Sequence, residues 1–229
     1  GVTDQTITDF SNVKVPEYYQ LAKNSSLPTS YTFTADKDQA ITIHLIHATK
    51  TVDGNKPDTI LSDVDKKQLI HTVTRMITDH VPGQEPLITK QSATITRRAT
   101  YDEVTGKLSN FSDWTTAELP GYTAKGAAGY TASETDVPAE TVTADMSNKT
   151  VNVAYTADKQ TVMIKFVDDN KNGKQVGELI PKQGVTDQTI TDFSNVKVPE
   201  YYQLAKNSSL PTSYTFTADK DQAITIHLI

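Results

Sequence analysis

TVMIKFVDDNKNGKQVGELI, at residues 161–180, is the stretch that predicts the fold most directly. Apolar side chains recur at every second position from 162 to 166, which indicates a strand with one buried face. The segment DDNKNG, at residues 168–173, is rich in turn residues that tolerate positive φ. Residues 176–180 then return as a second strand, so the stretch predicts a β-hairpin.

The residues after this hairpin predict the rest of one small domain. Ile190 and Phe193 are three positions apart within residues 187–196, which suits a helical turn or short helix before Pro199. Further strands are expected at residues 201–205, 214–217 and 223–229. Two strands, a short helix and more strands follow the order of a ubiquitin-like β-grasp fold, which we assign to residues 158–229.

The chain also contains an internal repeat. Residues 1–46 are identical at every position to residues 184–229, at an offset of 183 residues. Identity over 46 positions indicates a duplicated unit. A period this long predicts whole domains in series and not the layers of a solenoid, so the parent protein is expected to be an array.

The first copy of the repeat, residues 1–46, is predicted to be an incomplete β-grasp-like module. It has no counterpart of the hairpin at residues 161–180. The first strand of a β-grasp fold lies beside the last, so its loss should leave an open edge and a bare apolar face. We expect the first copy to be loosely ordered, or to be completed by another chain through strand-exchanged self-association.

A second, β-rich module is predicted for residues 47–157. Its strands are expected where the sequence alternates or is rich in Thr, with polar loops and a hairpin tip between them. The strands are residues 69–77, 87–100, 141–144 and 150–155, the loop is residues 53–58, and the tip is EVTGK at residues 103–107. The predicted fold class of the chain is therefore α+β, mostly β, with two kinds of module arranged as an elongated rod.

Composition excludes several functions. The net charge is −6 and no basic cluster occurs, which argues against a nucleic-acid partner. No cysteine is present, so disulfides, thiolate metal sites and cysteine nucleophiles are excluded. The apolar runs are far shorter than the ~20 residues that cross a bilayer, so membrane insertion is not expected. No leader precedes Gly1, so any targeting signal or anchor is expected outside these residues.

Two segments resemble the mucus-binding (Mub/MucBP) repeats of Lactobacillus cell-surface adhesins. TRRATYDEVTGKLSNFSDWTTAELPGYTA, at residues 96–124, resembles the Mub signature, with a TRT-type strand, a DxxTG hairpin, a DW pair and a PGY element. The hairpin at residues 161–180, followed by VPEYYQLAKNSSLPTSYTF at residues 198–216, is similar to the MucBP-type module. Here Pro199, Glu200 and Tyr201 replace the usual PGY.

The resemblance implies a non-catalytic adhesin repeat that binds mucin glycans or glycoproteins. It also implies an extracellular, cell-wall-anchored location on a Gram-positive bacterium, with immunoglobulin as a further partner. The alternative is a structural stalk that projects a distant binding domain. A glycosidase is the one enzymatic rival, because two carboxylates suffice for it, but the sequence has no GxSxG elbow, phosphate loop or metal motif.

Candidate ligand-binding residues are the aromatic and arginine side chains that suit sugars. Rings stack on apolar sugar faces, and a guanidinium can hold the carboxylate of an acidic sugar. The candidates are Trp114, Tyr122, Tyr130, Arg97 and Tyr201. Packing in a core or interface is the alternative for Trp114 and Tyr122, and solvated surface charge is the alternative for Arg97.

One candidate metal site lies in the predicted hairpin turn. Asp168, Asn170 and Asn172 match the opening of a calcium loop, in which oxygen ligands recur at alternate positions. The twelfth position holds Leu179 and not the required Glu, and strands flank the motif where helices should. The alternatives are therefore a calcium site and a plain hairpin turn, and no other cofactor is expected.

Overall fold

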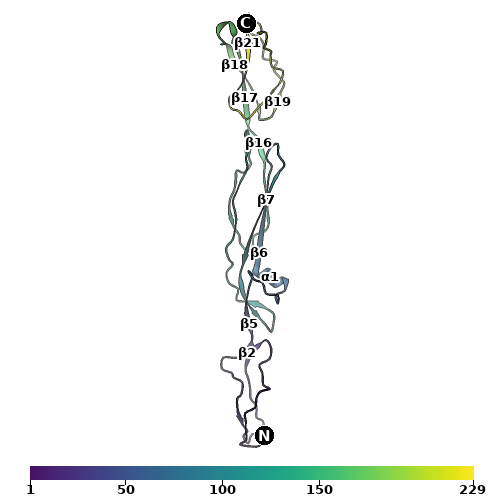
Figure 1. The fold of residues 1–229 in the computed structure, drawn as a ribbon, viewed down its shortest axis with the longest axis vertical. Helices are drawn as coiled ribbons and strands as arrows, with labels where there is room; N and C mark the ends of the chain where they lie inside the picture. Colours follow the sequence, from purple (N-terminus) through teal and green to yellow (C-terminus); the bar gives the residue numbers. More distant parts are fainter. The chain divides into compact units, whose positions relative to one another are not determined.

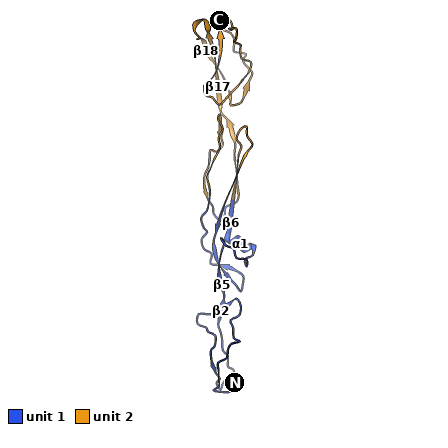
Figure 2. Ribbon diagram, viewed as in Figure 1, with its two compact units in different colours: residues 1–73, 92–118, 141–147 blue, residues 74–91, 119–140, 148–229 orange.

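The computed structural model describes all of residues 1–229, and it is mostly β, as the sequence predicts, with one α-helix (Figure 1). The chain divides into two compact units, which are described separately (Figure 2). Unit 1 contains Gly1–Val73, Ser92–Glu118 and Thr141–Ser147. Unit 2 contains Thr74–Gln91, Leu119–Glu140 and Asn148–Ile229, so β6 (Ile70–Asp79) and β7 (Leu87–Thr96) contribute residues to both.

The predicted hairpin forms the centre of the C-terminal module in unit 2. Strand β17 (Lys159–Asp168) pairs antiparallel with β18 (Lys174–Val185) and parallel with the last strand, β21 (Gln222–Leu228). The turn contains a short 3-10 helix, η1 (Asp169–Lys171), and the left-handed residue Asn172. A first strand in the middle of the sheet, parallel to the last, is the arrangement that a β-grasp fold requires.

No α-helix forms between β18 and β21, so of the two alternatives predicted for residues 187–196 the short helix is wrong and a single turn is present. The segment instead holds β19 (Thr189–Ile190), which pairs with β20 (Tyr214–Thr215), followed by a single turn that the Val196 amide closes on the Phe193 carbonyl at 2.9 Å. Asp192 Oδ1 accepts the amide of Ser194 at 3.1 Å, and this local bond competes with helix formation. The spacing of three between Ile190 and Phe193 therefore does not reflect helical periodicity.

The strand predicted at residues 201–205 is reduced to one bridge. Leu204 pairs with Leu228, and the amide of Gln203 donates to the carbonyl of Ile229 at 2.9 Å. Tyr201 has a φ of 69°, which extended strands do not allow. A double tyrosine suits a strand by composition, but the backbone turns at this point.

The core of this module joins the hairpin to the repeat. Ile164 and Phe166 of β17 pack against Phe193, Val196, Ile226 and Leu228, and all six are at most 8% exposed. Burial of each such side chain contributes about 1.5–3 kcal/mol. The hairpin therefore supplies one side of the core, and the repeated segment supplies the other side.

The remainder of unit 2 is built from short strands. Strand β15 (Lys149–Val153) runs parallel to β6, with Val151 opposite Ile77. Strand β11 (Tyr122–Thr123) pairs with β13 (Asp136–Val137), and β12 (Tyr130–Ala132) pairs with β16 (Tyr155–Ala157). The buried residues Ile77, Val137 and Val153 form their common core.

Unit 1 contains the only α-helix of the chain, which the sequence analysis missed. Helix α1 (Asp63–Leu69) begins at the cap Ser62, whose side chain accepts the amide of Asp65 at 3.1 Å. Leu69 is fully buried in a core with Val52, Leu61, Ala99 and Tyr101. With one buried residue in a polar helix, the apolar periodicity is too short to be recognised.

The strands of unit 1 include the predicted hairpin tip. Strand β8 (Arg98–Asp102) pairs with β5 (Thr49–Asp53) and with β9 (Leu108–Ser109), and residues 103–107 form the turn between β8 and β9. The amide of Gly106, at a φ of 68°, donates to the carbonyl of Asp102 at 2.8 Å. Two short strands with residues in both units, β10 (Glu118–Leu119) and β14 (Glu140–Thr141), pair with each other.

The first copy of the repeat forms two small ladders in unit 1. Strand β1 (Thr6–Ile7) pairs with β3 (Tyr31–Thr32), and β2 (Tyr19–Leu21) pairs with β4 (Leu45–His47). No residue of 1–46 is buried, as expected for a module without its hairpin.

Candidate ligand-binding site

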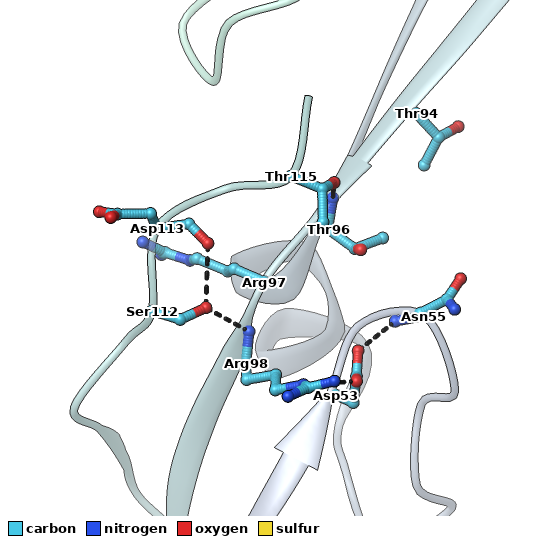
Figure 3. Close-up of a pocket in the computed structure, with 9 residues that line it drawn as sticks. All are labelled: Asp53, Asn55, Thr94, Thr96, Arg97, Arg98, Ser112, Asp113 and Thr115. Carbon is cyan, nitrogen blue, oxygen red and sulfur yellow. Dashed lines mark hydrogen bonds and ion pairs between the residues drawn. The ribbon is translucent and has the colours of Figure 1, made fainter. Parts of the chain in front are cut away.

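A polar pocket of about 490 Å³ lies in unit 1, at the start of β8 (Figure 3). Hydroxyl, amide, carboxylate and guanidinium groups line it, and no large apolar side chain does. The lining residues are Asp53, Asn55, Thr94, Thr96, Arg97, Arg98, Ser112, Asp113 and Thr115.

The pairing of β5 with β8 positions an ion pair in this pocket. Asp53 and Arg98 are opposite each other in the ladder, and Arg98 Nε donates to Asp53 Oδ2 at 2.8 Å. The amide of Asn55 donates to Asp53 Oδ1 at 2.9 Å. The Asn55 amide and Arg98 together lower the pKa of Asp53, so its carboxylate remains ionised at neutral pH. The Arg98 side chain is 69% exposed, which leaves its terminal nitrogens open to a ligand.

The wall of the pocket is a loop fastened to the strands by hydroxyl groups. Ser112 Oγ accepts the amide of Arg98 at 2.9 Å and donates to the carbonyl of Asp113 at 2.9 Å. Thr115 Oγ1 accepts the amide of Thr96 at 2.8 Å, and the amide of Thr115 donates to the Thr96 carbonyl at 2.8 Å. These bonds give the polar wall a defined conformation.

Two predicted site residues are in contact here, Arg97, which lines the pocket, and Trp114. The Arg97 guanidinium is 4.5 Å from the Trp114 ring centroid and 4.1 Å from that of Phe111. Its Nε donates to the carbonyl of Gln68 at 2.7 Å. Cation–π contacts of this kind contribute about 0.5–1 kcal/mol at exposed sites. Arg97 is thus held in place by protein groups, whereas the neighbouring Arg98 faces solvent.

Tyr122, Tyr130 and Tyr201 are not part of this pocket. Tyr122 donates from its hydroxyl to Oδ2 of the buried Asp79 at 3.0 Å, and burial together with this contact raises the pKa of Tyr122. Tyr130 donates to Asp187 Oδ2 at 2.7 Å, which raises the pKa of Tyr130. Tyr201 is 94% exposed. The ligand-binding role of the three tyrosines stays a prediction.

The predicted calcium loop is a hairpin turn in which Asp168 already has protein partners. Asp168 Oδ1 accepts the amide of Asn170 at 2.9 Å, and Oδ2 lies 3.2 Å from Lys171 Nζ. Asn172 is the left-handed residue that lets the chain enter β18. No group of three or more His, Cys, Asp or Glu side chains in residues 1–229 is arranged to hold a metal ion. The calcium site and the plain turn both stay predictions.

The sequence analysis missed most of the pocket because its residues are far apart in the chain. Asp53 and Asn55 precede α1, Thr94 and Thr96 are in β7, and Ser112 is in the loop after β9. The pairing of β5 with β8 brings Asp53 to Arg98, and the bond from the Arg98 amide to Ser112 Oγ adds the loop after β9. One available signal was Arg98 within a predicted strand, because an opposing aspartate could have been sought on a neighbouring strand.

No helix of the chain is long and apolar enough to cross a membrane.

Two family models match adjacent parts of the chain. A Muc B2-like domain matches residues 64–159, and a mucin binding domain matches residues 160–229. No curated protein matches the chain.

Solved structures of similar fold include the crystal structure of Mub-RV. That structure is 22% identical, with a TM-score of 0.50, and the match covers 69% of this chain and 87% of that one. The type 2 repeat of the mucus binding protein MUB from Lactobacillus reuteri is 25% identical, with a TM-score of 0.46, over 69% of this chain and 88% of that one. The mucin-binding domain of Spr1345 from Streptococcus pneumoniae is 24% identical, with a TM-score of 0.31, over 48% of this chain and 96% of that one.

Proposed function

This chain belongs to the family of mucus-binding (MucBP) repeats, and we propose that it acts as a non-catalytic repeat of a bacterial surface adhesin that binds mucin glycoproteins multivalently. The observation that supports this proposal most is the order of the two family matches, in which a Muc B2-like domain runs directly into a mucin binding domain. The duplicated 46 residues supply the second argument, because they indicate that such units recur in series.

The pocket at Arg98 has the chemistry expected of a glycan site. Sugar hydroxyls are both donors and acceptors, and the lining offers both kinds of partner. Two arginines and two aspartates balance its charge, so neutral sugars fit it as well as acidic ones. The exposed guanidinium of Arg98 provides paired donors that a sugar carboxylate or sulfate ester would accept.

Multivalency follows from repetition. A shallow polar pocket gives weak binding to one sugar, because few groups are desolvated. Linked copies raise the effective concentration of the second site, so avidity can exceed single-site affinity by ~10²–10⁴. Such an array would need to be anchored to the cell wall of a Gram-positive bacterium.

The test is binding of residues 1–229 to immobilised mucin, before and after enzymatic removal of its glycans. We expect binding that falls when the glycans are removed. Arg98→Ala should weaken binding about tenfold or more, because a hydrogen bond to a charged group contributes about 1.5–3 kcal/mol. Lys107→Ala, at the exposed tip of the β8–β9 hairpin, is the matched charge control and should bind normally.

Each alternative has its own outcome in this test. No binding to either form of mucin would overturn the proposal and favour a stalk. Binding that survives glycan removal would indicate recognition of protein surfaces, and immunoglobulin would then be the next ligand to test. Released sugar would indicate a glycosidase.

A further inference from the structure

A second polar cavity, of about 530 Å³, lies in unit 2, at the start of the part that matches the mucin binding domain. Its lining contains three glutamines and one lysine, but no aspartate or glutamate. The cavity therefore differs in charge from the pocket at Arg98, where two aspartates balance two arginines. The lining residues are Lys159, Gln160, Thr161, Gln183, Gly184, Val185 and Gln188.

The antiparallel pairing of β17 with β18 brings four of these side chains together. Lys159 is opposite Val185, and Thr161 is opposite Gln183. Side chains directly opposite each other in such a ladder have Cβ atoms about 4.5–5.5 Å apart. Residues two positions apart in a strand point to the same face. The ammonium, hydroxyl and amide groups are therefore close enough for one small ligand to contact all three.

This face of the hairpin is the one that the core does not use. Val162 and Ile164, which point to the other face of β17, are fully buried. On the cavity side Val185 is 36% exposed, and Lys159 is exposed as well. Strand β21 begins opposite Val162, so residues 159–161 have a ladder partner only in β18. A ligand can therefore reach the four side chains from solvent.

The cavity has a defined frame and an unpaired cation. Lys159 takes part in none of the ion pairs of the chain. Gln188 Oε1 accepts the amide of Val185 at 3.0 Å, and the Gln188 amide donates to the Val185 carbonyl at 3.0 Å. Gln160 Nε2 donates to Thr186 Oγ1 at 3.0 Å. These bonds hold the end of β18 in place, so ligand binding needs little ordering of the backbone.

The charge around Lys159 favours an anionic ligand. An ammonium group offers three donors and no acceptor, so an anion satisfies it better than a neutral hydroxyl does. A neighbouring cavity of about 370 Å³ shares residues 159–161 and adds a second lysine, Lys220. Its one carboxylate, that of Asp158, already accepts a hydrogen bond from Thr131 Oγ1 at 2.6 Å.

We infer that the cavity at Lys159 is a second sugar-binding site, which selects sugars that carry a carboxylate or a sulfate ester. The kind of ligand rests on the proposed function, whereas the charge preference rests on the lining alone. Lys159 pairs with the anionic group, Thr161 and Gln183 bind neighbouring hydroxyls, and the methyl groups of Val185 contact the apolar face of the ring. A charge-balanced site and a cationic site in one chain would then add avidity for acidic glycans.

The test titrates sialyllactose, a sulfated N-acetylglucosamine and lactose into the whole chain and follows the backbone amides by NMR. We expect both acidic sugars to shift the amides of residues 159–161 and 183–185. Lactose should bind about fivefold more weakly, because it lacks the ion pair with an exposed lysine. Lys159→Gln should weaken the binding of both acidic sugars by the same factor of about five, and Lys159→Arg should restore it. Lys90→Gln, an exposed strand lysine that lines neither cavity, is the matched control and should bind normally.

Each outcome of this titration bears on the site. Shifts with only one acidic sugar would support it and would identify the anionic group that it binds. Equal affinity for lactose, unchanged binding by Lys159→Gln, or no shift at residues 159–161 with either acidic sugar would overturn the inference. Arg98→Ala should leave these shifts unchanged. Since the adhesin proposal is read from mucin binding and from Arg98→Ala, either proposal can fail while the other stands.

Discussion

The two copies of the repeat share 46 residues and differ in what surrounds them. Both form the same short ladder, with Ile7 opposite Tyr31 in the first copy and Ile190 opposite Tyr214 in the second. Both close it with the same edge-to-face ring pair, whose centroids are 5.5 Å and 5.4 Å apart. Only the C-terminal copy forms a long final strand, β21, and buries its apolar residues. Turn and ladder geometry is therefore encoded locally, whereas the final strand requires a partner.

The two copies differ because local contacts and packing contacts contribute differently to the free energy of folding. Local turns and side-chain bonds form between neighbours in the chain and contribute little each. A strand edge must satisfy its amides with another strand, and apolar side chains gain free energy only when a second surface removes them from water. The β17–β18 hairpin supplies both in the C-terminal copy.

The largest expected effect comes from removing one aromatic ring that is buried differently in the two copies. Phe216 is fully buried, whereas its counterpart Phe33 is partly exposed. Phe216→Ala should lower the stability of the C-terminal module by about 3–5 kcal/mol, because it leaves a cavity in a closed core. Phe33→Ala should cost about 1 kcal/mol or less, as partly exposed sites do. Amide exchange at β17 and at residues 31–33 measures the two effects, and equal losses would contradict the comparison.

A second prediction concerns the far end of the first copy, where His47 meets Asp102 of β8. His47 Nδ1 lies 2.8 Å from Asp102 Oδ2, and the His47 ring meets that of Tyr19 edge to face at 5.6 Å. The hydrogen bond from His47, with the amides of Thr105 and Val104, lowers the pKa of Asp102 to about 2.

The sign of the pH dependence follows from this lowered pKa. A carboxylate with a depressed folded-state pKa stabilises the fold fully above its unfolded value of 3.8, and this contribution is lost as pH falls towards about 2. Protection of the β2 and β4 amides against exchange should therefore fall between pH 4 and pH 2 in the native chain. In Asp102→Asn that pH dependence should be much weaker. The ladder of β19 and β20, which lacks this pair, serves as the internal control.

The sequence was sufficient wherever neighbouring residues determine the structure. The turn at residues 168–173 follows from its Asp, Asn and Gly residues, the tip at residues 103–107 follows from Gly106, and both form. The alternation of apolar residues from 162 to 166, before the turn at residues 168–173, predicted a strand with one buried face. Strand β17 confirms this prediction. The missing hairpin of the first copy predicted its lack of buried residues.

The sequence failed where distant residues decide the structure. The spacing of Ile190 and Phe193 resembled a helix, but Phe193 is buried by the hairpin and Asp192 caps a turn. Asp53 and Arg98 are 45 positions apart, so their ion pair depends on a strand pairing that no local pattern reveals. Arg97 and Trp114 could be grouped by their proximity in the chain, but their contact with each other could not be foreseen.

The smallest expected effect sharpens the comparison, because it should be the same in both copies. Thr6 and Thr32 share a side-chain hydrogen bond of 2.7 Å, and their counterparts Thr189 and Thr215 share one of 2.7 Å. Both pairs are exposed and involve no residue of the hairpin. Thr32→Ala and Thr215→Ala should each weaken their ladder by about 0.2–1 kcal/mol, the usual contribution of a cross-strand pair. The amides of Phe33 and Phe216, which close these ladders on Gln5 and Gln188, report the two losses separately. A larger loss in the C-terminal copy would show that the hairpin also stabilises the ladder, and the separation of local from packing contributions would then have to be abandoned.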